Sequence, residues 1–308
     1  MITLQKPRIN ERTAEVRSIK YRLVAQGDSW FDYPGADIID CLRNTHGQDI
    51  ENISISRSSL EDIVGASADP VGNRSVDGEY AGGAERMADL LDLIGRAGDS
   101  LNAVLLSAGG NDLAGPGFTE LIDAALLEME DPGRRVSQTV RFWNLRIAYR
   151  KVFRAVIRKG RTTGARLHIF VHGYDYPWPD GRGLEEQGPW FHEAFNSKGF
   201  LFENDNAEQL RKRRAVVKVL VDNLNEMLVQ LTREPEFAGL VHHVDLRNTL
   251  RARSDWANEL HPTEEGFAKL AVLLDQVIQQ TLYPWCSVRE LSGYEVCLGK
   301  NRGGDSID

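Results

Sequence analysis

The 308-residue sequence lacks the features of a disulfide-rich or membrane-spanning protein. It has only three cysteines, and the wide spacing of Cys41, Cys286 and Cys297 fits neither a disulfide framework nor a zinc site. No stretch approaches the roughly 18 consecutive apolar residues of a membrane span, and the amino terminus lacks the apolar core of a signal peptide. We therefore expect no integral membrane association and a cytoplasmic protein.

Positive charge is also in short supply. The sequence has 37 Lys and Arg against 45 Asp and Glu, a formal net charge of −8, so a nucleic-acid backbone would be repelled overall. No GxxxxGK[ST] motif is present, and no GxGxxG motif follows an expected strand, which removes the usual phosphate-binding loops. We expect no nucleic-acid partner, no metal and no cofactor.

What is present is a regular alternation of short apolar runs with longer segments of helical period. This pattern predicts an α/β protein, a three-layer α/β/α sandwich with a five-stranded parallel sheet. The strands are expected at residues 21–26, 50–56, 103–107, 167–172 and 240–245. The helices are expected at residues 37–44, 84–96, 119–129, 138–159, 207–232 and 263–281.

The whole chain, residues 1–308, is expected to form a single domain with a polar tail after Tyr283. Residues 65–83 are rich in Gly, Asp and Ser and predict a surface loop. Residues 173–206 carry six Trp and Phe side chains among Pro and Gly, which indicates a packed insertion or a lid. The basic run at 211–214 is expected to be a solvated helix face.

The strongest local signal is Gly27-Asp28-Ser29-Trp30, directly after the first expected strand. Ligands of open parallel sheets bind beyond the carboxyl ends of the strands, so Ser29 stands where a nucleophile would be useful. A turn in which Asp28 or Ser29 caps the following segment would explain the same residues.

Two further segments follow other expected strands. Residues 107–112 read SAGGND, in which paired glycines allow close backbone approach and Asn111 can donate to an oxyanion. Residues 255–262 read DWANELHP, which places His261 at a loop-to-helix junction where it can act as a general base. Each segment alone fits an ordinary turn, but all three converge on one edge of the predicted sheet.

Together, GDSW, GGND and NELHP resemble blocks I, III and V of the SGNH hydrolases, also called GDSL esterases and lipases. The resemblance extends over about residues 20–282. It implies a flavodoxin-like strand order 2-1-3-4-5 and a serine esterase that needs no cofactor. By this resemblance Ser29 is the nucleophile and His261 its base, and the oxyanion hole is formed by Asn111 with the backbone N–H groups of Ser29 and Gly110.

The sequence departs from the family in two places. The family's second block usually supplies a Gly after strand two, whereas this chain has none between residues 54 and 60, which leaves a backbone N–H of Arg57 or Ser58 as the donor. The family's catalytic acid usually stands three residues before the His, and that residue here is Asn258. The alternatives are Asp255 as the acid, Glu259 as a weaker substitute, or a dyad oriented by Asn258 or a backbone carbonyl.

The substrate is less defined than the chemistry. Asp28, Trp30, His172 and Tyr174 are expected to contact it, because they stand at strand ends around the same crevice. A small-molecule ester is predicted, either an acyl ester or an O-acetylated sugar. The rival interpretation, favoured by Asn258 and the missing Gly, is a binding module of the same fold with little or no catalysis. The oligomeric state does not follow from the sequence.

Overall fold

The structure, a computed structural model, describes residues 19–65, 83–115, 117–126, 132–184, 188–200, 202 and 207–283. At its centre lies a parallel sheet with the strand order β2-β1-β3-β4-β5. The predicted sheet and its strand order are confirmed. The strands are β1 (Arg22–Gly27), β2 (Asp49–Asn52), β3 (Ala103–Ser107), β4 (His168–His172) and β5 (Val241–Val244).

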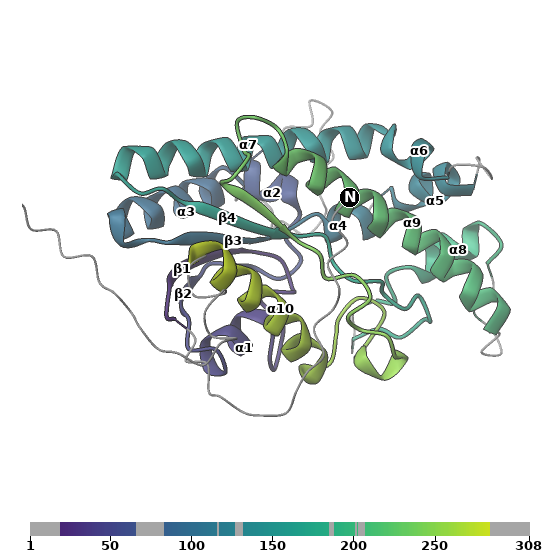
Figure 1. Cartoon of the computed structure of the whole chain (residues 1–308). Helices are drawn as coiled ribbons and strands as arrows, with labels where there is room; N and C mark the ends of the chain where they lie inside the picture. Colours follow the sequence, from purple (N-terminus) through teal and green to yellow (C-terminus); the bar gives the residue numbers. More distant parts are fainter. Residues whose placement is uncertain are drawn as a thin grey trace, which may run out of the picture.

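Helices cover both faces of the sheet and complete the three layers (Figure 1). One face is covered by α1 (Ile38–Asn44) and α10 (Glu264–Leu282), which contact each other. The other face carries α3 (Gly83–Ala97), α7 (Val140–Thr163) and α9 (Ala207–Thr232). Shorter helices lie near the carboxyl ends of the strands or in connections: α2 (Leu60–Val64), α4 (Gly110–Ala114), α5 (Phe118–Leu126), α6 (Pro132–Ser137), α8 (His192–Ser197), and two 3-10 turns, Gly98–Ser100 and Arg253–Asp255.

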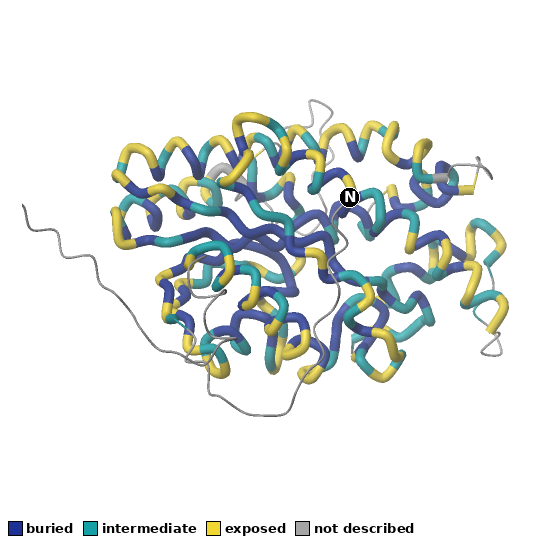
Figure 2. Tube along the Cα trace, in the orientation of Figure 1, coloured by how far each residue is buried: buried dark blue, intermediate teal, exposed yellow. Residues whose placement is uncertain are grey.

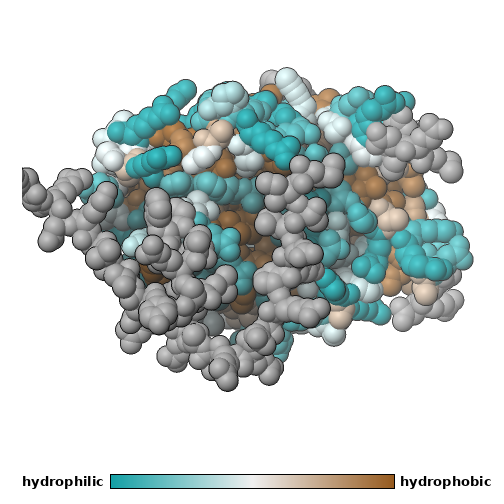
Figure 3. Space-filling view, viewed as in Figure 1, coloured by the Kyte–Doolittle hydropathy of each residue, from teal (hydrophilic) through white to brown (hydrophobic). Residues whose placement is uncertain are grey.

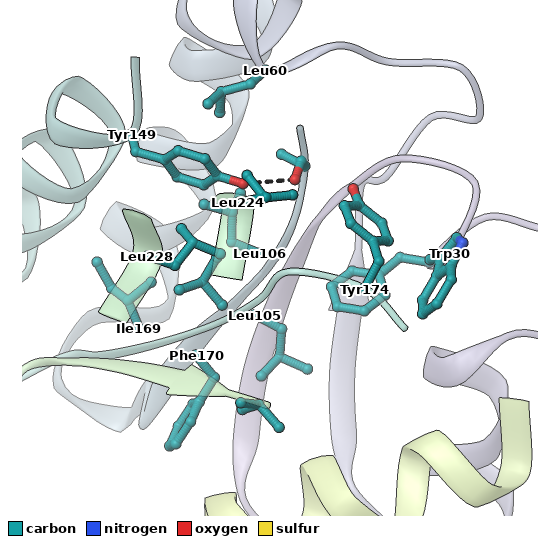
Figure 4. Close-up of a cluster of buried hydrophobic side chains, with 14 of the residues drawn as sticks. Trp30, Leu60, Leu105, Leu106, Tyr149, Ile169, Phe170, Tyr174, Leu224 and Leu228 are labelled. Atoms are coloured by element: carbon teal, nitrogen blue, oxygen red, sulfur yellow. Dashed lines mark hydrogen bonds between the residues drawn. The ribbon is translucent and has the colours of Figure 1, made fainter. Parts of the chain in front are cut away.

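The continuous apolar runs of the sequence form the buried centre of the sheet, which Figure 2 shows in dark blue. Every residue of β3 is buried, as expected for a strand covered by helices on both faces. Leu224 and Leu228 of α9 lie in one cluster with Leu105 and Ile169 (Figure 4), and the Tyr149 hydroxyl donates a 2.6 Å hydrogen bond to the Ala108 carbonyl. Hydrophilic residues cover much of the described surface in the view of Figure 3.

Two predicted elements differ from those observed. The expected helix at 138–159 is α7, which begins at Val140 because the Thr139 side chain caps it by accepting a hydrogen bond from the Phe142 N–H, and which continues to Thr163. The short helix α6 that precedes it was not predicted. The second strand ends at Asn52, four residues earlier than expected, and the chain then turns through Arg57 at φ +68°. Most of the expected 65–83 loop, and the tail after Tyr283, lie outside the described residues.

The insertion after β4 is packed against α9, and this overturns one expectation for the basic run. The Arg213 guanidinium lies 3.8 Å from the Phe202 ring centroid, and that of Arg214 lies 3.8 Å from the Trp178 ring centroid. Arg213 is buried and donates to the Pro179 carbonyl at 2.8 Å, so the prediction of a solvated face is wrong for these two arginines. Among the helices described, none is long and apolar enough to cross a membrane.

Candidate active site

The turn after β1 is built around a close approach to β3. A Cβ on Gly27 would lie 2.6 Å from the Ser107 carbonyl oxygen, so only glycine fits there. The Asp28 N–H donates to that same oxygen at 3.0 Å, and the turn then presents Ser29 at the carboxyl edge of the sheet.

The Asp28 carboxylate stabilises this turn by accepting hydrogen bonds. Its Oδ1 accepts hydrogen bonds from the Trp30 N–H at 3.0 Å and the Ser107 hydroxyl at 2.7 Å, while Oδ2 accepts from the Tyr174 hydroxyl. Burial raises the pKa of the Asp28 carboxyl to about 6, although these donors act in the opposite direction. Both oxygens are thus engaged within the turn, and Asp28 also lines the pocket beside Ser29, so its contact with substrate stays a prediction.

Ser29 and His261, which are 232 residues apart in the sequence, meet at this edge. The Ser29 Oγ lies 2.8 Å from the His261 Nε2, and the two residues are 9% and 6% exposed. This distance is that of a nucleophile hydrogen-bonded to its general base.

Asn258 orients the imidazole. Its Oδ1 lies 3.0 Å from the His261 Nδ1 and accepts backbone hydrogen bonds from Leu260 and His261, both at 2.9 Å. Two backbone N–H donors require the amide oxygen on this side, and the Nδ2 on the other side donates to the Tyr33 hydroxyl at 3.2 Å. The Nδ1 of His261 therefore carries the proton, and the Nε2 lone pair faces Ser29.

The imidazole lies in an apolar, aromatic environment. The Tyr33 ring stacks on it with centroids 4.6 Å apart, and the Trp190 ring contacts it edge-on at 5.3 Å. Burial lowers the pKa of His261 to about 4. The imidazole is therefore neutral, as a base must be, over the whole neutral range. Trp190 belongs to the aromatic-rich insertion at 173–206 that the sequence indicated, whereas Tyr33 carried no sequence signal, and the fold alone makes both of them neighbours of His261.

The two carboxylates considered as catalytic acids point elsewhere. The Asp255 Oδ1 lies 2.6 Å from the Lys269 Nζ, which lowers the pKa of that carboxyl. Glu259 is buried and accepts from the Gly181 N–H at 2.8 Å and the Phe191 N–H at 3.1 Å, and burial raises its pKa to about 7. The structure thus brings Asn258 to His261, and neither Asp255 nor Glu259.

The four expected oxyanion donors separate into two pairs. The Gly110 N–H donates to the Tyr174 hydroxyl at 3.0 Å and the Ser58 N–H donates to the Ile55 carbonyl at 3.2 Å, so both are already engaged. The Asn111 Nδ2 donates to the Ser58 carbonyl at 2.9 Å, which fixes the amide and leaves its second hydrogen available. The Ser29 N–H has no hydrogen-bond partner within the described part of the chain.

Arg57 adopts the conformation that the missing Gly would have favoured. Its φ of +68° lies in the left-handed region, one residue before the buried Ser58. The loop therefore keeps a glycine-like turn without the glycine.

Two of the remaining expected substrate contacts line the site and one does not. Trp30 and Tyr174 line the pocket beside Ser29, and the Trp30 Nε1 donates to the Leu260 carbonyl at 3.1 Å. His172 is only 1% exposed, with the Trp30 ring stacked on it at 5.5 Å and the Tyr174 ring edge-on at 5.0 Å. Because these rings cover it, His172 is part of the interior, and the expectation of a substrate contact is wrong for it.

An apolar pocket opens directly beside Ser29. One wall is a face of α9 on which the side chains recur at three- and four-residue steps: Val217, Leu220, Val221 and Leu224. A second wall is the segment after Asn111, with Leu113, Ala114 and Phe118, and Phe191 of the insertion adds a third. These three walls, together with Ser29 and Asn111, form the apolar pocket.

The fold has relatives among solved structures. No protein-family model and no curated protein matches the chain. The lipase Lip_vut3 from a goat rumen metagenome matches at 12% identity over 83% of this chain and 97% of its own, with a TM-score of 0.49. An extracellular lipase from Streptomyces rimosus matches at 16% identity over 83% of this chain and 99% of its own, with a TM-score of 0.48.

A protein from Slackia heliotrinireducens, provisionally described as an SGNH hydrolase, also matches. Its identity is 13% over 84% of this chain and 100% of its own, with a TM-score of 0.44. At such low identities the likeness concerns the fold, and no activity is transferred from it.

Proposed function

We propose that the protein is a serine hydrolase of the SGNH type that cleaves a carboxylic ester. The observation that carries this proposal is the 2.8 Å contact between the Ser29 Oγ and the His261 Nε2, with the imidazole tautomer set by Asn258. The arrangement matches what nucleophilic catalysis needs: a hydroxyl, a neutral base and a group that orients the base.

In this mechanism the Ser29 Oγ attacks the ester carbonyl and its proton passes to the His261 Nε2. The oxyanion accepts hydrogen bonds from the Ser29 N–H and the free hydrogen of the Asn111 amide. The tetrahedral intermediate collapses to an acyl-enzyme as the imidazolium gives its proton to the departing alcohol. Water then gives a proton to His261 and attacks the acyl carbonyl, and the second tetrahedral intermediate releases the acid as His261 returns the proton to the departing Ser29 Oγ.

The site differs from a full triad in one respect. Asn258 can orient the imidazole, but a neutral amide does not stabilise the imidazolium as a carboxylate does. This favours a slow hydrolase and motivates a second candidate, a binding module in which the same pocket holds an ester without turnover.

The test is labelling and turnover at Ser29. A fluorophosphonate probe should label the wild type and not Ser29→Ala, and hydrolysis of p-nitrophenyl esters should fall about 10³-fold or more in Ser29→Ala and His261→Ala. Ser137→Ala, which changes an exposed serine of α6, is the control and should label like the wild type. Ester binding that is unchanged in Ser29→Ala, with no labelling of the wild type, would instead identify the binding module.

A further inference from the structure

Helix α7 concentrates positive charge on a protein whose net charge is negative. Its 24 residues include eight Lys and Arg and no Asp or Glu, whereas the whole chain has a formal net charge of −8. Two carboxylates that follow α9 pair with two of these cations: Glu234 lies 2.6 Å from Arg150, and Glu236 lies 2.5 Å from Arg154. These two pairs leave α7 with a surplus of positive charge.

The side of α7 that faces away from the sheet carries one continuous stripe of exposed side chains. They recur at three- and four-residue steps, which is one face of an α-helix. The stripe begins with Val140, Trp143 and Ile147, which are 71%, 48% and 37% exposed. A line of exposed apolar side chains of this kind marks a contact surface. The stripe continues with four exposed cations, which together with the three apolar residues form the α7 stripe: Lys151, Arg154, Arg158 and Arg161.

The apolar half of the α7 stripe lies on the active-site side of the molecule. Because α7 ends just before β4 begins, its last turn lies at the amino edge of the sheet and its first turn towards the carboxyl edge, where Ser29 stands. In Figure 1, α7 runs along the upper edge of the fold with α6 at its amino-terminal end. In the first turn of α7, the Arg141 guanidinium donates to the carbonyl of Asp112, the residue that follows Asn111. The exposed apolar side chains and Ser29 therefore share one end of the molecule.

The composition of the α7 stripe decides between partners. A second copy of the chain would place cations against cations, because a two-fold interface brings the same surface together. A nucleic acid would attract the cations but would offer no apolar surface to the aliphatic side chains. An anionic bilayer matches both halves, since Lys and Arg attract its headgroups while Trp, Ile and Val enter the boundary between headgroups and acyl chains.

We propose that the α7 stripe docks the protein on the surface of an anionic lipid bilayer. The contact is peripheral: the apolar half enters the headgroup boundary, and the cations hold the rest of α7 against the headgroups. Docking in this way turns the end of the molecule that carries Ser29 towards the lipid surface. The inference goes beyond ester cleavage and does not depend on it, because docking needs no chemical step at Ser29.

The experiment is co-sedimentation of the full chain with vesicles of phosphatidylcholine, either alone or with about 30% phosphatidylglycerol. Binding should require the anionic lipid and should weaken about tenfold or more when the salt concentration rises from about 0.1 M to about 1 M. Ser29→Ala should bind like the wild type, which separates docking from catalysis.

Matched substitutions test the two halves of the stripe. Ile147→Glu should lower the partition coefficient about tenfold or more, because it removes apolar contact and adds a repelled charge. Val272→Glu makes a similar change at a 41% exposed position of α10, on the opposite face of the sheet, and should bind like the wild type. Lys151→Gln should lower the partition coefficient about fivefold, which is the effect of one cation near an anionic surface. Lys20→Gln, at an exposed position outside α7, should change it by about twofold or less.

Trp143 provides an independent readout. The tryptophan emission of the wild type should shift to the blue when anionic vesicles are added, and Trp143→Phe should still bind but lose most of that shift. Binding of the wild type without such a shift, or equal binding to neutral and anionic vesicles, would overturn the proposal. Failure to bind anionic vesicles would also overturn it, and binding of RNA that is weakened in Lys151→Gln would then assign the stripe to a nucleic acid.

Discussion

The His261 Nδ1 lies 3.0 Å from the Oδ1 of Asn258, and the same oxygen accepts the His261 backbone N–H at 2.9 Å. An amide thus stands where the serine hydrolases that this chain resembles usually place a carboxylate. The amide fixes the tautomer, but it adds no charge that would hold a proton on the ring.

The first prediction concerns the pH dependence of the wild type. Since burial lowers the pKa of His261 to about 4, kcat/KM should stay level as the pH falls from 8 to about 5 and should be halved only near pH 4. An ordinary histidine base would lose half of its activity near pH 6.5. The measurement is hydrolysis of one ester across this range.

Folding must be followed in the same experiment. A buried neutral histidine has a lower pKa in the folded than in the unfolded state, so its contribution to stability is full above about pH 6.5 and is lost as the pH falls towards 4. Circular dichroism at each pH separates this loss from titration of the base. An acid limb near pH 6.5 in a fully folded protein would contradict the low pKa.

Replacing the amide by a carboxylate is the second prediction. Asn258→Asp keeps an acceptor for the two backbone N–H groups and adds a negative charge beside the imidazole. The negative charge should raise the pKa of His261, the acid limb should move up with it, and kcat at pH 8 should increase about tenfold or more. Asn258→Ala is the control, because it removes the acceptor and should lower kcat. An unchanged rate in both variants would show that Asn258 does not act on the base.

Much of this arrangement could be predicted from the sequence, because the signals were local. The strand at 103–107 and the helix at 207–232 have the predicted bounds, since a fully buried strand and a long amphipathic helix leave clear periodicities. The contact between Ser29 and His261 followed from their positions after different parallel strands, whose carboxyl ends share one edge.

The sequence could not show which hydrogen-bond or ion-pair partner each candidate site residue takes in the folded protein. Asp255 and Asn258 both stand within reach of His261 along the chain, and Lys269 on the next helix takes Asp255 away. Likewise, Gly110 matched the oxyanion motif, but Tyr174 from the loop after β4 occupies its N–H. The apolar side chains that recur at three- and four-residue steps along the predicted 207–232 helix also line the apolar pocket, because a helical period does not distinguish a packed face from a cavity wall.

The third prediction follows from the place of Asp255. Because its carboxylate is paired with Lys269, Asp255→Ala should change kcat/KM by about twofold or less while costing some stability. The comparison is with Ser29→Ala, measured on the same ester and at the same pH. A loss in Asp255→Ala that approaches the loss in Ser29→Ala would make Asp255 the catalytic acid after all, through a loop position other than the one observed.

The last prediction concerns the strained turn before Ser58. Arg57 is exposed and has a φ of +68°, which costs a residue with a side chain about 1–2 kcal/mol relative to glycine. Arg57→Gly removes this cost, but glycine also has more conformational freedom in the unfolded chain, which offsets part of the stabilisation. We therefore expect Arg57→Gly to raise the free energy of unfolding by about 1 kcal/mol. Arg57→Ala removes the same side chain but keeps the strain, so it should show no such gain in urea denaturation. Equal stabilisation by both substitutions would trace the effect to the arginine side chain and not to the backbone.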